Sequence, residues 1–282
     1  MQICGRHFSP SDLDWIRDQV DSQPDLNRVE LSRLFCRHVN WLKLDGGLKE
    51  MSCRVALLRL ERAGLIRLPA PRTKPAAVRG IKRTVRGEVK TPIEIDAGRV
   101  ELIIKPVDRS TAPLWNELID RYHYLGYSRM GGAQMRFIVR AGKDLVALLG
   151  FSAAAWRVAP RDHFIGWTEA QRQDNLHRVV NNSRFLILPW VHGINLASRI
   201  LSRMARHLPD YWSCRYNYRP LLLETFVERE RFAGTCYKAA NWICVGQTLG
   251  RGKWDRKNAF AKPVKTIWLY PLHRRFKEAL CR

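Results

Sequence analysis

Residues 135–155 read MRFIVRAGKDLVALLGFSAAA, which is two apolar runs, 135–140 and 145–155, separated by the short sequence AGKD. Both runs are rich in residues that favour β-strands, and a short connection that contains glycine is typical of a hairpin. The stretch therefore predicts two adjacent antiparallel strands.

Further elements are expected on both sides of this hairpin. Strands are predicted by the apolar runs at 100–105 (VELIIK), 184–189 (RFLILP), 220–227 (PLLLETFV) and 242–245. Helices are predicted by the spacing of apolar residues at 112–124, 195–208 and 235–242. The order strand, helix, two strands, strand, helix, strand, helix, strand indicates a mixed α/β (α+β) domain over residues 98–282.

The first 69 residues show the pattern of a small helical domain. Ser9 or Ser11 and Asn27 are suitable N-caps for a first and a second helix. A third helix is expected at 49–63, followed by a short strand at 65–69 (LIRLP). Three helices and a strand resemble a winged helix-turn-helix domain, in which the last helix enters the major groove of DNA.

The expected third helix carries the candidate DNA contacts of this domain. Its buried side is predicted to consist of Met51, Val55 and Leu58. Arg54 is a candidate for contact with a base edge or a phosphate, and Lys49 and Arg59 are candidates for phosphate contacts. Small three-helix domains also dock proteins or dimerise, and this alternative stays open.

The chain is strongly basic, since 49 Lys and Arg face 26 Asp and Glu and the net charge is +23 at pH 7. Such an excess attracts polyanions, so nucleic acid, and DNA first, is the expected partner. An anionic membrane surface and a purely solubilising coat are the alternatives. Much of the excess lies in residues 67–90, with eight basic residues and one acidic, and 250–282, with ten basic and two acidic.

Two other segments carry candidate DNA contacts. Residues 70–97 are expected to form a basic, proline-containing linker that can follow a phosphate backbone, with Arg83 as the candidate contact. Asn181 and Asn182 are expected in a loop before the strand at 184–189. Their amides can hydrogen-bond a base edge or cap that loop.

The strongest candidate for nucleic-acid binding is the segment 246–257, GQTLGRGKWDRK. Arg251, Lys253 and Arg256 supply positive charge there, and Trp254 offers a face on which a base can stack. A flexible basic tail is the alternative interpretation.

Several classes of protein are not expected. The seven cysteines are odd in number and show no CxxC spacing, so neither a disulfide framework nor a zinc ribbon is predicted. No run approaches the roughly 18 to 20 apolar residues of a membrane span, and the N-terminus has no apolar run of signal-peptide type. The sequence shows no HExxH motif, P-loop or carboxylate cluster, and no metal site is predicted. A cytoplasmic protein without a membrane partner is expected.

Two places hold side chains that can carry chemistry. Tyr122, His123 and Tyr124 are adjacent at the end of a predicted helix, where imidazole can move protons and a phenol can act as nucleophile. A packed aromatic helix end is the alternative. Glu224 lies inside an apolar strand and therefore needs a partner, a metal or a raised pKa. Pairing with an arginine, such as Arg184 on the preceding strand, is the alternative to catalysis.

The element order and two motifs resemble the Gcn5-related N-acetyltransferase (GNAT) fold. Residues 188–198 (LPWVHGINLAS) sit where that family passes from a strand into a helix that binds pyrophosphate, and 236–242 (CYKAANW) resembles its short helix with a tyrosine acid. The resemblance implies a splayed sheet that holds acyl-coenzyme A, with Gly193 and Asn195 at the cofactor and Tyr237 as the acid. The family's loop carries closely spaced glycines, whereas the segment HGIN here has one, so the cofactor does not follow.

A longer resemblance is to the DruA family, whose members are components of Druantia anti-phage systems. It is carried by YHYLG (122–126), GFSAAAWRVAPR (150–161), VVNNSRFLILPW (179–190), LLETFV (222–227) and FAGTCYKAANWICVGQTLGRG (232–252). Similar proteins lie beside transposases or are fused to them, so the resemblance implies transposase or defence-system proteins as partners. The phage DNA-modification protein Mom is also GNAT-like and offers an analogy for acyl chemistry on DNA.

These observations predict a DNA-interacting protein of a mobile element or an anti-phage system, acting on DNA as a nuclease or in transposition. The alternative is a GNAT-type acyltransferase that modifies DNA or another substrate. Acetyl-coenzyme A or a divalent metal would be the cofactor of these reactions, and no motif assigns either.

Overall fold

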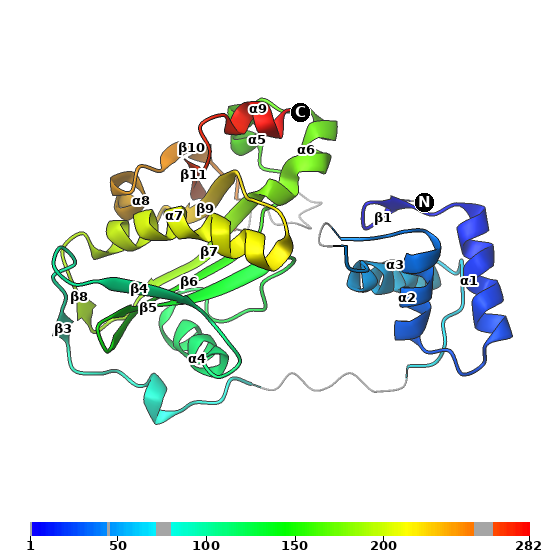
Figure 1. Ribbon diagram of the computed structural model, residues 1–282, viewed down its shortest axis with the longest axis horizontal. Helices are drawn as coiled ribbons and strands as arrows, with labels where there is room; N and C mark the ends of the chain where they lie inside the picture. Colours follow the sequence, from blue (N-terminus) through cyan, green and yellow to red (C-terminus); the bar gives the residue numbers. More distant parts are fainter. Residues whose placement is uncertain (1, 44–45, 72–79, 251–261) are drawn as a thin grey trace. The chain divides into compact units, whose positions relative to one another are not determined.

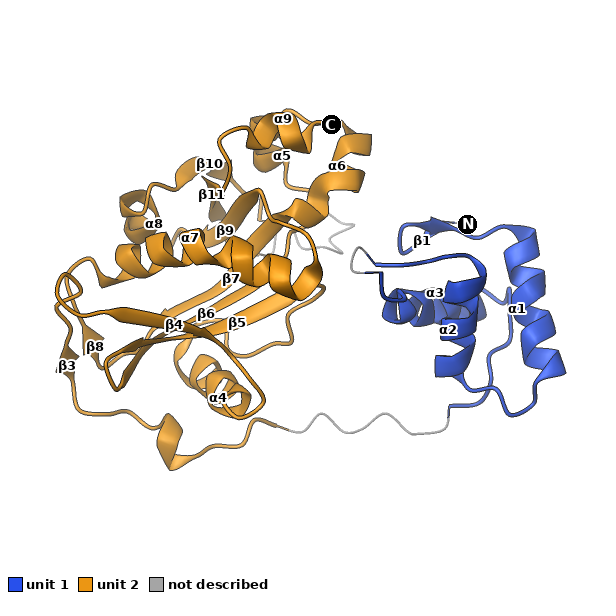
Figure 2. Cartoon of the chain, in the orientation of Figure 1, with its two compact units in different colours: residues 1–79 blue, residues 80–282 orange. Residues whose placement is uncertain are grey.

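The computed structural model describes residues 2–43, 46–71, 80–250 and 262–282 (Figure 1). The chain divides into two units, Met1–Arg79 and Gly80–Arg282, which Figure 2 colours separately. Within the described ranges, no helix is both long enough and apolar enough to cross a bilayer.

The N-terminal unit contains the three expected helices. Its elements are β1 (Gln2–Ile3), β2 (Arg6–His7), α1 (Pro10–Ser22), α2 (Arg28–His38) and α3 (Glu50–Arg62). The expected N-caps are confirmed, since the Ser9 hydroxyl accepts from Asp12 N at 3.1 Å and the Asn27 side chain accepts from the first amides of α2. The helices enclose a core that includes the buried side chains of Phe35 and Leu57.

The prediction for the buried side of α3 was wrong at Met51 and Val55, whereas Leu58 is partly buried and packs against the core. Met51 and Val55 are 63% and 40% exposed. The residues of α3 that are buried are Cys53, Ala56, Leu57 and Leu60. The small side chains of Cys53 and Ala56 let α3 lie close to α2. The exposed Met51 and Val55 were therefore a poor guide to the contact face.

The strand expected at 65–69 is not formed. This segment is irregular, and its main chain bonds to side chains: Leu68 N donates to Glu61 Oε1 at 3.2 Å, and Arg28 Nε donates to Pro69 O at 2.6 Å. An antiparallel bridge joins Leu42 to Leu48, before α3 rather than after it. The unit is therefore a helical domain in which the wing expected after α3 is absent from residues 65–71.

The second unit is built on a mixed sheet with helices. Its strands are β3 (Ile93–Glu94), β4 (Leu102–Pro106), β5 (Gln134–Ala141), β6 (Asp144–Ala153), β7 (Val179–Ile187), β8 (Val191–His192), β9 (Leu222–Glu228), β10 (Ile243–Gln247) and β11 (Lys265–Pro271). Its helices are α4 (Ala112–Tyr122), α5 (Ala159–Ile165), α6 (Glu169–Asn175), α7 (Leu196–Tyr216), α8 (Thr235–Ala239) and α9 (Phe276–Leu280). Single 3₁₀ turns lie at Val85–Gly87 and Leu176–Arg178.

Seven strands form the main sheet in the order β10-β11-β9-β7-β6-β5-β4 (Figure 1). The hairpin expected from residues 135–155 is confirmed as β5 and β6, with Phe137 opposite Leu149. All neighbours are antiparallel except β7 and β9, which run parallel. This arrangement confirms the mixed α/β body and the order of the predicted elements.

The parallel pair β7 and β9 separates soon after it begins. Pairing is restricted to residues 179–181 of β7 and 222–224 of β9, although both strands continue beyond that point. The long helix α7 connects the two strands and packs its apolar side chains, such as Met204 and Trp212, into the main core. The divergence leaves a gap in the hydrogen bonding at the centre of the sheet.

Several elements of this unit were missed by the sequence interpretation, among them α5, α6, α9 and β11. Helices α5 and α6 lie between β6 and β7 and cover a second core with α9. Strand β11 inserts between β9 and β10, and its residues Ile267 and Leu269 are fully buried. Part of the basic C-terminal region is therefore a central strand rather than a tail.

Part of the expected linker also belongs to this unit. Residues 80–97 pack onto the body, where Thr84 N and Oγ1 donate to the buried carboxylate of Glu117 at 2.6 and 2.7 Å. Strand β3 then pairs in parallel with β8, with Ile93 opposite Val191.

Candidate functional site

A cavity of about 590 Å³ opens where β7 and β9 diverge, and it is called here the β7–β9 cavity. Its size lies in the range of small-molecule sites, about 300 to 1,000 Å³. A third of its lining residues carry an aromatic ring, namely Tyr122, His123, Tyr124, Phe185, Phe226, Phe232 and Tyr237. The three sequence candidates at the end of α4 and the one on α8 are thus brought to a single place.

The end of α4 positions the first three rings. The Tyr122 hydroxyl donates to Gly87 O at 2.9 Å, which fixes its ring against the segment before β3. His123 Nδ1 accepts from Leu125 N at 3.2 Å, and its ring stacks on Tyr124 with centroids 4.9 Å apart. The Phe232 ring is tilted against Tyr124, with ring centroids 5.4 Å apart.

Burial and positive charge control the ionisation of these groups. Burial, with the cations Arg184 and Lys265, lowers the pKa of His123 to about 4. Burial, with the carboxylate of Glu228, raises the pKa of the Tyr124 phenol. At neutral pH the site therefore offers a neutral imidazole and a neutral phenol, which act as hydrogen-bonding groups rather than as ionised nucleophiles.

A group of cations lies beside His123 and Tyr124. The Arg231 guanidinium carbon lies 5.6 Å from the centre of the Tyr124 ring, and Arg231 Nε pairs with Glu228 at 2.8 Å. Arg184, on β7, donates to Ser183 O and Ser128 Oγ, and burial lowers its pKa and that of Lys265. Among the described residues, neither Arg184 nor Lys265 has a carboxylate oxygen within 4.0 Å.

A hydrogen-bond network forms one wall of the cavity. Tyr237 OH donates to Asn182 Oδ1 at 2.9 Å, while Asn182 Nδ2 donates to Gly150 O and Arg184 O. Thr225 Oγ1 donates to Asn182 O at 3.0 Å. Burial raises the pKa of the Tyr237 phenol, so it remains protonated. Asn182 is therefore a buried strand residue that orders this wall, and its expected position in a loop was wrong.

Asn181, like Asn182, lies in strand β7 rather than in a loop. Glu224 is not among the residues that line the cavity. Glu224 pairs with a guanidinium, as one of the two interpretations expected, but the partner is Arg161 of α5 at 2.8 Å rather than Arg184. Arg161 lies on α5, a helix that the sequence interpretation did not predict. Asn181 is the residue paired in register with Glu224.

The loop before α7 is the position at which the GNAT resemblance places the pyrophosphate of acyl-coenzyme A. A Cβ on Gly193 would lie 2.5 Å from Ile95 O, and Ile95 N donates to His192 O at 2.8 Å. The glycine thus makes room for the chain's own main chain, not for an approaching phosphate. Asn195 precedes α7 with a φ of 58° and makes no side-chain cap. These residues do not fit the glycine-rich loop that the fold implies.

The other DNA-contact candidates are spread over both units. Lys49 precedes α3, Arg54 lies 3.8 Å from Glu50, and Arg59 is exposed. Arg83, in the second unit, pairs with Asp120 at 2.8 Å. Four further candidates lie outside the described residues: Arg251, Lys253, Trp254 and Arg256.

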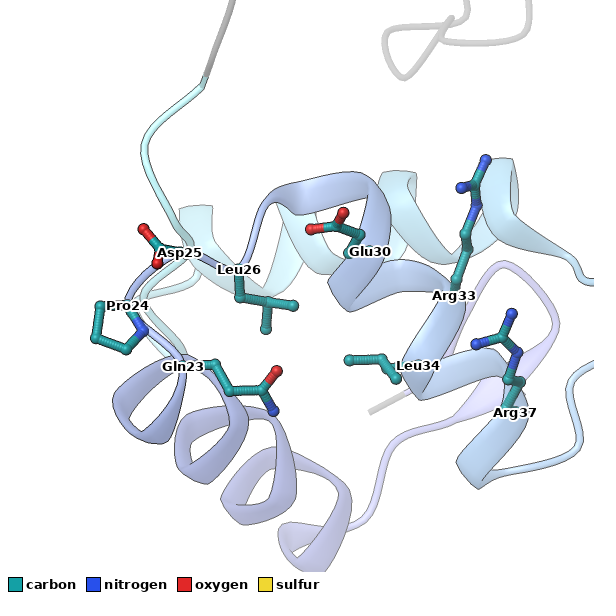
Figure 3. Close-up of a pocket in the computed structure, with 8 residues that line it drawn as sticks. All are labelled: Gln23, Pro24, Asp25, Leu26, Glu30, Arg33, Leu34 and Arg37. Carbon is teal, nitrogen blue, oxygen red and sulfur yellow. The ribbon is translucent and has the colours of Figure 1, made fainter.

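The N-terminal unit has a hollow of its own, of about 570 Å³, between the end of α1 and α2 (Figure 3). Arg33 and Arg37 project from α2 at one end of it, Asp25 lies at the other end, and Glu30 lies between them. Arg33 Nε donates to Glu50 Oε2 at 3.0 Å. The mixture of charges favours neither anions nor cations there.

The sequence interpretation missed several residues at or near the cavity. Arg231 and Phe232 line it and were not singled out. Lys265, a charged neighbour of His123, was not singled out either, and Arg184 was considered only as a partner for Glu224. The run KTIWLYP at 265–271 could have revealed β11 and with it Lys265, because its β-branched and aromatic residues favour a strand.

In the described part of the chain, no group of three His, Cys, Asp or Glu side chains is placed to hold a metal ion.

The solved structures that resemble this chain include N-acetyltransferases. The ribosomal-protein-S18-alanine N-acetyltransferase from Escherichia coli is 11% identical, with a TM-score of 0.38, over 61% of this chain and 94% of that one. The putative acetyltransferase yncA from Salmonella typhimurium, solved with acetyl-CoA, is 11% identical, with a TM-score of 0.40, over 62% and 95%. No curated protein matches the sequence.

The sequence model of one family matches most of the chain. Its match covers residues 59–275, which includes the whole main sheet and all residues named at the β7–β9 cavity. The family is described as Druantia protein DruA, and this chain belongs to it.

Proposed function

We propose that this protein binds DNA as a component of an anti-phage defence system or a mobile element, and that its β7–β9 cavity receives an unpaired base. The observation that supports this is the combination of an aromatic lining with Arg184, Lys265 and Arg231 around His123 and Tyr124. Stacking on aromatic rings together with positive charge for the backbone is how single-stranded nucleic acid is bound.

The chemistry of the cavity suits a nucleotide better than a simple anion. A base presents a flat π face that Tyr124 and Phe232 can contact. Because Nδ1 of the neutral His123 accepts from Leu125 N, its Nε2 carries the proton and can donate a hydrogen bond to an acceptor on a base edge. A base in a duplex must leave the stack to enter such a cavity, which costs a few kcal/mol, whereas an unpaired base enters freely. We therefore expect single strands to bind more tightly than duplexes of the same length.

The test is fluorescence anisotropy with labelled single-stranded and duplex oligonucleotides over a range of salt concentrations. Phe232→Ala removes a ring that lines the cavity and is 50% exposed, so the fold should tolerate the change. Because base stacking contributes about 1 to 3 kcal/mol, affinity for single strands should fall by about 5- to 150-fold. Trp156→Ala is the matched control, since this exposed aromatic lies outside the cavity lining.

Two results would contradict the proposal. One is a chain that binds neither form of DNA at low salt, where phosphate contacts are strongest. The other is an equal loss of affinity in Phe232→Ala and Trp156→Ala, which would place the bound strand away from the cavity.

A further inference from the structure

A second hollow of the body, of about 340 Å³, lies beside α4 and β5 and is called here the arginine cleft. Three guanidinium groups line it, those of Arg129, Arg136 and Arg215, and its lining contains no Asp or Glu. Its other lining residues include Asn116, Ser128 and Gln134. A concave surface with three cations and no carboxylate is built for an anion.

Arg136 is the fixed centre of this cleft. It is half-buried on β5, its Nη1 donates to Asn116 Oδ1 at 2.7 Å, and its guanidinium carbon lies 5.4 Å from the centre of the Trp115 ring. In the part of the chain that the structure describes, no carboxylate oxygen lies within 4.0 Å of it. A charge that is withdrawn from water without a counter-charge is costly, so an anionic ligand would stabilise it.

Arg215 is held in place from α7. Its Nε donates to Tyr216 OH at 3.2 Å, and Tyr216 OH donates in turn to Gln134 O at 2.7 Å. This chain of hydrogen bonds ties the end of α7 to the start of β5. Arg129 is exposed at the rim and can adjust to a ligand.

We propose that the arginine cleft binds a phosphate group. The planar guanidinium forms paired hydrogen bonds with phosphate oxygens, and it remains charged at every relevant pH. Three such groups in one cleft match the several oxygens and the charge of a phosphate better than they match a single carboxylate. The same chemistry fits free phosphate and the phosphodiester of a nucleic acid.

The cleft and the β7–β9 cavity share a wall. Ser128 and Met130 line the cleft, and both contact residues at the cavity: Arg184 Nη2 donates to Ser128 Oγ at 2.8 Å, and Ser183 Oγ donates to Met130 Sδ at 3.1 Å. A strand with a base in the cavity could therefore place a neighbouring phosphate in the cleft. This last step rests on the proposed function, whereas phosphate binding itself does not.

The test compares two double variants with the wild type by calorimetry, using inorganic phosphate and a short single-stranded oligonucleotide. Arg129→Gln with Arg215→Gln removes two cations from the cleft, and the control, Arg140→Gln with Arg206→Gln, removes two from elsewhere on β5 and α7. Phosphate should bind the wild type at millimolar concentration. The cleft variant should bind it at least about tenfold more weakly, as expected when two charge-assisted contacts are lost, and the control within about twofold.

The titrations with phosphate and with the oligonucleotide test different claims. Equal losses in the two double variants, or no heat with phosphate up to about 10 mM for the wild type, would overturn the phosphate site. If phosphate binding responds as expected but no oligonucleotide binds, the cleft stands as a site for free phosphate and the proposed function falls. Arg136→Lys keeps the charge but loses the planar fork, and phosphate affinity should fall in it while circular dichroism remains that of the wild type.

Discussion

Arg161 Nη1 lies 2.8 Å from Glu224 Oε2, and both side chains are completely shielded from solvent. The same guanidinium donates to Ala155 O at 2.7 Å and pairs with Asp162 at 2.7 Å, while Ala155 N donates to Glu224 Oε1. The pair therefore attaches α5 and the end of β6 to β9, at the point where β9 still pairs with β7. Its role is to support the strand from which the cavity opens.

The first prediction concerns this buried ion pair. Arg161→Met leaves the carboxylate of Glu224 without its partner in a dry environment, which costs about 3 to 5 kcal/mol in other buried pairs. We expect the free energy of unfolding, measured with urea, to fall by about that amount. Arg157→Gln breaks the exposed pair with Glu169 and should change it by at most about 1 kcal/mol. If the two substitutions lower the free energy of unfolding equally, the buried pair contributes no more to stability than the exposed pair.

His123 supplies a prediction about pH. Burial, together with Arg184 and Lys265, lowers its pKa to about 4 in the folded protein, whereas an unfolded histidine titrates near about 6.5. Between these values the unfolded chain binds more protons, so the stability contribution of the neutral imidazole is present above about pH 6.5 and is lost as the pH falls towards about 4. His123→Phe should flatten the dependence of the unfolding free energy on pH in this window. A profile identical to that of the wild type would contradict the assignment.

Much of the body could be predicted because its strands are apolar runs of the right length. The hairpin at 135–155 and the strand that contains Glu224 need no tertiary information, since their composition and turn residues favour one structure. Tyr122, His123, Tyr124 and Tyr237 were predicted as separate candidates, and the structure brings them to one cavity.

The remaining features depend on contacts that a linear pattern does not contain. Helices α5 and α6 are seven residues each, too short for a clear helical period, and their missed Arg161 left Glu224 with the wrong predicted partner. The buried face of α3 follows from the close approach allowed by Cys53 and Ala56, which propensity does not reveal. Lys265 influences the pKa of His123 because β11, which it begins, inserts beside β9.

A third prediction tests why residue 193 is glycine. In Gly193→Ala the new Cβ would lie 2.5 Å from the carbonyl oxygen of Ile95, so β3 or the start of α7 must shift. Forced overpacking of this kind costs about 1 to 3 kcal/mol, which thermal unfolding should reveal. Gly131→Ala, with no atom within 4 Å of its Cβ position, should stay within about 0.5 kcal/mol of the wild type. If the stability of Gly193→Ala is unchanged, close contact with Ile95 is not the reason for the glycine, and an approaching ligand again becomes an explanation.

The last prediction separates the two exposed arginine-bearing helices of the N-terminal unit. Arg59 on α3 and Arg37 on α2 are both exposed, and neither is ion-paired with a described residue, so they are matched in charge and setting. If α3 lies against a DNA backbone, Arg59→Gln should weaken binding to all sequences alike and lower the slope of log affinity against log salt by about one. Arg37→Gln should leave the slope unchanged. The reverse result in salt-dependent anisotropy would assign the DNA contact to α2, and two unchanged slopes would remove this unit from the DNA interface.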